Sequence, residues 1–308
     1  FLAGKKGDAL TGTAALWIET GALPPAAFSD LEARFRYADN LLHIESGRLQ
    51  AYQGSVALSG TVAPLSKTWE LRPVLENLSL EKLLQQLPEA KDNFAGLFSG
   101  AFVVKSPVEA SAEALPLTTG TFRIDQGVIR NKNIMAAVLD SMFGLKGLAG
   151  LIDARAKKLN KYKYTKFDFM EGDFELENQI MQLKKLFIAN IQTSKADGAE
   201  AEVSGTVRLT DKTLDLKGNL VLSPKHSARL TRRVKALKSL FNAQKRMVLP
   251  VRVSGPTEKP RFAVDTRYVM KAIGSYYAGR LLKKRSDDEK IDTRETVRQL
   301  LEGLLERR

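Results

Sequence analysis

The chain has 308 residues and a net charge of +13, since 48 Lys and Arg stand against 35 Asp and Glu. It contains no cysteine, which excludes disulfides, thiol catalysis and cysteine-based metal sites. Residues 225–308 hold 22 of the basic and 9 of the acidic residues, so all the excess positive charge lies at this end. This asymmetry indicates an anionic partner, either a membrane surface or a nucleic acid, and the alternative is a solvated basic face that serves only solubility.

The sequence shows no N-terminal signal pattern and no apolar run long enough to span a bilayer. It does not begin with Met. We therefore expect a soluble or peripheral piece of a longer or processed protein, whose parent can carry an anchor.

The N-terminal part predicts strands. Ala14–Ile18 is a candidate strand, and residues 31–62 read as a meander in which apolar residues alternate with polar ones. A short helix is expected at 79–87, because its leucines follow helical spacing between an N-cap at Ser79 and a stop at Pro88. The turns of the meander are expected at Asp39-Asn40, Ser46-Gly47 and Gln53-Gly54.

The middle of the chain predicts a hairpin over Phe122–Arg130 and a helix over 134–159 with a broad apolar stripe. Three glycines weaken that helix, each by ~1 kcal/mol relative to Ala, so a break is expected near Gly144. An ordinary helix packed on a sheet is the favoured interpretation, and a gate or membrane-dipping element is the alternative.

The clearest strand signal lies between Ala201 and Pro224. Apolar and polar residues alternate on both sides of the polar link 210–213, which is typical of a hairpin with one apolar face. The apolar residues predicted to share that face are Val203, Val207, Leu209, Leu214, Leu216, Leu220 and Leu222.

Similar units recur along the chain. Segments led by Phe35, Phe122 and Phe174 each place apolar residues before a polar turn and an apolar pair after it. Ser59–Val62 also recurs as Ser204–Val207. Such repetition indicates an elongated sheet or solenoid rather than a compact enzyme core.

After residue 224 the chain becomes basic. A helix is expected at 227–243, with an apolar row of Leu230, Val234, Leu237 and Phe241. Two short strands at 248–253 and 261–265 follow, and then helices at 267–284 and 292–306. The candidate contacts to an anionic membrane surface are Arg229, Arg232, Arg233, Lys235 and Lys238.

The sequence offers no sign of catalytic chemistry. His43 and His226 are the only histidines, and neither has neighbours that suggest a triad or a metal site, so we expect structural roles for both. No P-loop, dinucleotide-binding fingerprint or zinc motif is present. We therefore predict a protein that is not an enzyme and that needs no metal or cofactor.

The order of four segments resembles the C-terminal region of the AsmA-like proteins of Gram-negative bacteria. They are 121–138 (TFRIDQGVIRNKNIMAAV), 167–183 (FDFMEGDFELENQIMQL), 201–224 and 249–265 (LPVRVSGPTEKPRFAVD). The upstream meander and residues 78–84 (LSLEKLL) are similar to the repeats that precede that region, so the resemblance covers about 31–265. Family members usually begin with a transmembrane helix, from which this sequence departs.

The resemblance implies a periplasmic protein anchored to the inner membrane through a segment outside this chain. It implies a lipid-transfer or lipid-homeostasis function, in which phospholipid acyl chains lie in a β-groove between the inner and outer membranes. The apolar row of the 201–224 hairpin is then predicted to line a lipid-accessible groove, and a closed core is the alternative. Phospholipid, an anionic membrane surface and other envelope proteins are the implied partners.

Together these observations predict a mainly β fold with flanking α-helices: an elongated, twisted antiparallel sheet curled into an apolar groove, with amphipathic helices at the C-terminal end. We divide the chain into a repeated hairpin region (1–130), an AsmA-like β region (131–265) and a basic helical tail (266–308). Two other functions stay open: a scaffold for outer-membrane biogenesis, and a basic nucleic-acid-binding protein. Against the latter, aromatic residues are not interleaved with the basic residues of 225–246.

Overall fold

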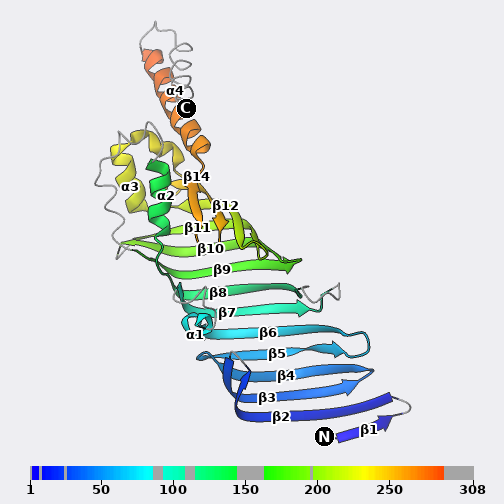
Figure 1. The fold of residues 1–308 in the computed structure, drawn as a ribbon. Coiled ribbons are helices and arrows are strands. Elements are labelled where there is room, and N and C mark those ends of the chain that lie inside the picture. The colour runs from blue at the N-terminus through cyan, green and yellow to red at the C-terminus, as the bar shows by residue number, and fades with distance from the viewer. Residues whose placement is uncertain are drawn as a thin grey trace.

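The computed structural model describes residues 2–6, 9–23, 26–85, 93–107, 115–143, 163–194 and 197–287. Within them, fourteen strands form one open, curled sheet in which every strand pairs antiparallel with its neighbours in sequence (Figure 1). Steps of about 4.8 Å between neighbouring strands make this sheet roughly 60 Å long, with β1 and β14 at its opposite ends. The predicted fold class is therefore confirmed.

The strands cover most of the described chain. The first eight are β1 (Leu2–Lys6), β2 (Ala9–Leu23), β3 (Ala26–Ala38), β4 (Leu41–Ala51), β5 (Gly54–Ala63), β6 (Thr68–Ser79), β7 (Phe94–Lys105) and β8 (Leu117–Ile129). The remaining six are β9 (Thr165–Glu177), β10 (Ile180–Ser194), β11 (Asp197–Arg208), β12 (Thr213–Val221), β13 (Val248–Pro256) and β14 (Arg261–Val264). Because β8 pairs with β9, a single sheet runs through the first two predicted regions.

In the part of the chain that the structure describes, four α-helices and a 3₁₀ helix accompany the sheet. They are α1 (Leu80–Leu84), α2 (Ile134–Phe143), α3 (Pro224–Arg233), the 3₁₀ helix η2 (Lys235–Leu240) and α4 (Thr266–Asp287). The helices expected at 79–87, 134–159 and 267–284 are confirmed over their described parts, and Ser79 caps α1 as expected. The break expected near Gly144 and the helix expected at 292–306 lie outside the described residues.

The single helix expected at 227–243 is wrong. Val234, with φ −125° and ψ 90°, separates α3 from η2, as its β-branched side chain favours extended backbone. The change of direction lets η2 bury Leu237 and Leu240, whereas Phe241 stays half-buried.

Two expected turns are instead irregular points inside strands. The hairpin expected at Phe122–Arg130 is wrong, because β8 continues through it with a bulge at Gln126, whose φ is 52°. The turn expected at Ser46-Gly47 is also wrong, since β4 runs on and its pairing shifts register there. In both cases an extra residue is absorbed by local bending rather than by reversal of the chain.

The sheet has one apolar and one polar face. Register carries the apolar face from strand to strand, as where Leu214 lies opposite Val207 and Val207 lies opposite Met181. Charged residues occupy the other face, which carries ion pairs such as Arg252–Asp215 at 2.8 Å. The apolar face of β2–β13 includes Leu16, Phe35, Ile44, Leu58, Leu71, Phe102, Phe122, Phe174, Leu183, Val203, Leu216 and Val253.

The two long edges of the sheet differ. The helices α1, α2 and α3 all follow strands that end on the same edge, which we call the helix edge (Figure 1). The opposite hairpin edge carries the connections β1–β2, β3–β4, β5–β6, β7–β8, β9–β10, β11–β12 and β13–β14. Because no described helix follows a strand that ends there, the helices can cover the apolar face only from one side.

Candidate functional site

Within the described residues, no second layer lies over the apolar face of β2–β8, apart from the short α1 beside β6 and β7 at the helix edge. Most of the described side chains there are half-buried, and among them Ala33 and Leu78 are the only fully buried apolar ones. Leu16, near the N-terminal end, is 43% exposed. Adjacent side chains on the same face of a sheet bury one another only in part. This part of the sheet therefore presents a large apolar surface to the solvent.

Four phenylalanines form a shelf at the middle of this face. Phe98 stacks on Phe102 and Phe122 with ring centroids 6.4 Å apart, and Phe174 lies 5.8 Å from Phe102. Glycines on the neighbouring strands make room for the rings: a Cβ added to Gly120 would lie 2.6 Å from the ring of Phe102. The rings can therefore pack directly against the backbone of the neighbouring strands.

Beyond β8 the helices close the helix-edge side of the face into a core. Val138 and Met142 of α2, Leu230 of α3, and Val269 of α4 are buried with strand residues in one cluster. Side-chain oxygens fix these helices in place. The Thr165 hydroxyl accepts a hydrogen bond from the Ile134 N–H, Ser141 from the Val264 N–H, and Ser227 from the Met247 N–H, at 2.8–3.0 Å.

The row predicted to line the groove divides between covered and open positions. Val203, Leu216, Leu220 and Leu222 are buried under the helices, with 7% or less of each exposed. Val207 and Leu214 are half-buried nearer the hairpin edge, and Leu209, just beyond the end of β11, is 37% exposed. The prediction that all seven share one lipid-accessible surface is thus not met at the four buried positions.

The sequence reasoning did not single out the most open part of the face. Phe35, Ile44, Leu58 and Phe102 lie on β3, β4, β5 and β7 and share the face of the predicted row. A signal was present, because Phe35 leads one of the repeated segments and occupies the same alternation. The alternation does not predict which strands a helix will cover.

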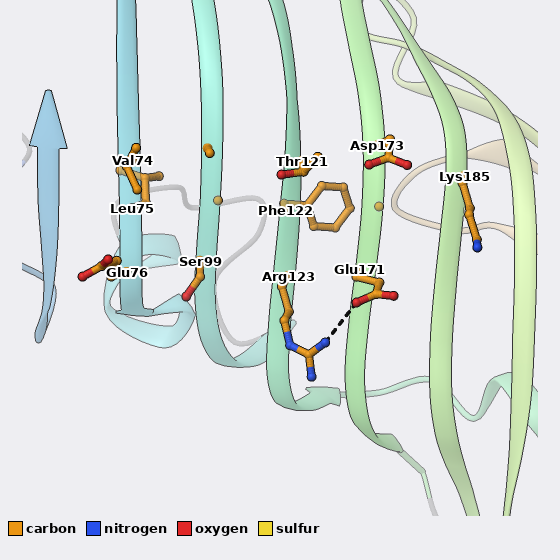
Figure 2. A pocket seen from close by; sticks show the side chains of 13 residues that line it. Val74, Leu75, Glu76, Ser99, Thr121, Phe122, Arg123, Glu171, Asp173 and Lys185 are labelled. Carbon is orange, nitrogen blue, oxygen red and sulfur yellow. Dashed lines mark hydrogen bonds and ion pairs between the residues drawn. The ribbon is translucent and has the colours of Figure 1, made fainter. Parts of the chain in front are cut away.

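The polar face carries a shallow hollow of about 520 Å³ across β6–β10 (Figure 2). Its central cation, Arg123, is already engaged: it pairs with Asp125 at 2.8 Å and Glu171 at 3.0 Å and lies 3.9 Å from the ring centre of Phe169. The hydrogen bond that Arg123 donates to Asp125, and then the charges of Asp125 and Glu171, hold the pKa of Arg123 above its ordinary value. We therefore interpret this hollow as an ion-pair network on a sheet face.

Arg229, Arg232, Lys235 and Lys238 form a basic cluster on α3 and η2, and over the described residues this cluster is free of such partners. The apolar row of these two helices packs into the core, which leaves Arg229, Arg232, Lys235 and Lys238 exposed with no ion pair or hydrogen bond from their side chains in the described chain. The sequence has no Asp or Glu between Asp215 and Glu258. The side chain of Arg233, the fifth predicted contact, lies outside the described residues.

Both histidines occupy structural positions. His43 is half-buried on the polar face of β4, and His226 is buried at the start of α3, where its Nδ1 lies 3.0 Å from the Ser223 hydroxyl. Over the described ranges, no group of His, Asp and Glu is arranged to hold a metal ion. None of the described helices is both long and apolar enough to cross a membrane.

Comparison with protein-family models, curated proteins and solved structures finds no match to this chain.

Proposed function

We propose that the chain is part of an AsmA-like lipid-transfer or lipid-homeostasis protein, in which the apolar face of β2–β8 holds phospholipid acyl chains while their headgroups stay in water. One observation carries the proposal: a half-buried apolar face runs across seven consecutive strands, and α1 at the helix edge is the only described helix that packs beside them. Removing an acyl chain from water is worth about 0.8 kcal/mol per CH₂, so such a surface can hold lipid with no directed polar contact.

The chemistry of the face favours acyl chains over a peptide. The backbone groups of these strands are taken up in sheet pairing on both sides, so the face offers side-chain contacts only. A peptide laid on it would bury N–H and C=O groups without partners, at a cost of a few kcal/mol each. An acyl chain has no such groups and loses nothing by this burial.

The proposal extends to place and partner. The resemblance supports a periplasmic position between the inner and outer membranes, with no reaction needed for transfer. The exposed basic cluster of α3 and η2 supports an anionic membrane surface as the partner at the C-terminal end, because each basic residue near such a surface contributes about 1 kcal/mol. Docking of this cluster requires no insertion, since Leu230, Val234 and Leu237 of its apolar row are already buried in the core.

Site-specific photo-crosslinking tests the proposed function. p-Benzoylphenylalanine in place of Phe35, on the open apolar face, is expected to form adducts with phospholipid in cells. The same residue in place of the adjacent Arg34, exposed on the polar face, is the matched control and is expected to give none.

Three outcomes separate the alternatives. Lipid adducts at position 35 alone support the groove. Protein adducts at position 35 with no lipid would favour the assembly scaffold, because the face would then be covered by a partner. Equal lipid labelling at positions 34 and 35 would contradict the proposal.

A further inference from the structure

The helices cover the C-terminal strands unevenly. Along β12, exposure rises from 1% at Leu220 and 7% at Leu216 to half-burial at Leu214, nearest the hairpin edge. Along β11, Val203 is 7% exposed and Val207 is half-buried, and along β13 the same holds for Val251 and Val253. The cover thus ends before the hairpin edge on three neighbouring strands.

The half-buried residues beside this core form a continuous row, which we call the hairpin-edge strip. Register places Leu176 opposite Met181, Met181 opposite Val207, and Val207 opposite Leu214. Next to Leu214 stands Gly255, and nothing lies within 4 Å of a Cβ built on it. The strip comprises Leu176, Met181, Val207, Leu214, Val253 and Phe262.

The strip joins the open face of the N-terminal strands. Leu176 of β9 pairs with Thr118 of β8, Thr118 with Val104 of β7, and Val104 with Leu71 of β6. No charged residue interrupts this row. The apolar surface therefore narrows at the helices but does not stop there.

We propose that acyl chains bind along the hairpin-edge strip, beside the helices that cover the rest of the C-terminal strands. The groove then continues to β14 and does not end at α2. The inference rests on the proposed function and concerns the course of the same groove. Residues of one face are spaced about 6.6–6.8 Å along a strand, so a strip one or two residues wide offers room for acyl chains but not for a second protein layer. The occupant must also lack hydrogen-bonding groups, because the strands pair on both sides at Val207, Leu214 and Val253.

A phospholipid with a diazirine near the end of its acyl chain tests the path. After loading into the purified protein and irradiation, peptide mass spectrometry locates the adducts. We expect adducts on β3–β8 and also at Val207, Leu214 and Val253, with none at the covered Leu220 and Leu249. Adducts confined to β2–β8 would overturn this inference and leave the proposed function standing, whereas no adducts anywhere would overturn both.

Two variants interrupt the strip. Leu214→Asp places a carboxylate in the path and should lower adducts on β13 and β14 by at least about tenfold, because desolvating a charge costs more than 1.4 kcal/mol. Gly255→Asn adds a polar side chain where there is open space, and Asn tolerates the positive φ of 96° better than most residues. Both should leave adducts on β3–β8 unchanged.

Ser204→Asp, exposed on the polar face, is the matched control and should change neither region. Circular dichroism shows whether each variant folds, and Gly255→Asn serves if Leu214→Asp does not. Unchanged adducts on β13 and β14 in a folded variant would overturn the inference.

Discussion

Leu58 and Leu220 have the same side chain and lie on the same face of one sheet, yet their surroundings differ. Leu58 is half-buried among neighbours of its own face, whereas Leu220 is 1% exposed beneath the helices. How deeply a residue of this face is buried therefore depends on whether a helix packs over it. Neither the strand it belongs to nor the alternation of the sequence decides this.

This difference predicts opposite responses to an introduced charge. Leu220→Asp should lower the free energy of unfolding by several kcal/mol, because an unpaired carboxylate would be buried. Leu58→Asp should cost about 1 kcal/mol or less, because water still reaches that position, while reducing bound lipid. Urea denaturation and lipid extraction measure the two effects. A large loss of stability in Leu58→Asp would show that a further layer covers the open face.

The sequence predicted the face of Leu214 and Leu216 because alternation has a period of two, but it did not predict which of them would be covered. Coverage depends on where α2 and α3 dock, which contacts distant in sequence decide. Gln126 shows the same limit at shorter range: Asp125-Gln126-Gly127 has the composition of a turn, but pairing with β7 and β9 holds it in a bulged strand. Propensity was overruled there by tertiary pairing.

At the scale of elements, α3 and η2 combine two surfaces with separate uses. The inner surface completes the core through Leu230, Leu237 and Leu240. The outer surface gathers cations that are not needed for packing. Arg246 shows what a structural cation looks like here, because it pairs with Glu200 at 3.0 Å and donates to the carbonyl groups of Leu222 and Val221.

Liposome flotation tests the outer surface. Changing Arg229, Arg232, Lys235 and Lys238 to Gln removes about 4 kcal/mol of attraction to anionic lipid, so partitioning onto phosphatidylglycerol vesicles should fall by roughly three orders of magnitude at low salt. Neutral vesicles and high salt should abolish the difference.

The control changes the exposed Arg34, Arg48, Lys67 and Lys217 to Gln, which alters net charge equally. If both variants float alike, the cluster has no role at a membrane. Salt-sensitive binding to nucleic acid that only the first variant loses would support the nucleic-acid alternative instead.

At the scale of the whole molecule, each strand pairs only with the strands before and after it in sequence. Length along the sheet is therefore proportional to the number of strands, as in repeat proteins whose units contact only their neighbours. Two consecutive strands bring the chain back to the same edge of the sheet. Strands should therefore be deleted or inserted in pairs if the rest of the sheet is to keep its pairing.

Deletion of residues 41–67 removes β4 and β5 and joins β3 to β6 through the Asp39-Asn40 turn. Because β6 also begins at the hairpin edge, Tyr37 would face Trp69 and the apolar face would stay in register. We expect a cooperatively folded protein about 10 Å shorter, measured by small-angle scattering and thermal unfolding. Deletion of 197–221, which removes Leu216 and Leu220 from the core, is the contrasting case and should unfold the C-terminal part. Failure of the first deletion to fold would mean that contacts beyond nearest neighbours hold these strands.

The sequential strand order also determines the order in which parts of the protein can fold during synthesis. Hairpins such as β3–β4 need only local contacts and can close as soon as both strands have left the ribosome or crossed a membrane. The core, by contrast, needs both α2 and α4, so it cannot close until residue 273 has arrived. Until then the growing sheet presents an unpaired edge and an apolar face together, which is the combination that favours aggregation. We expect the nascent protein to depend on a holding chaperone during this interval, and to need it less once the last helix has docked.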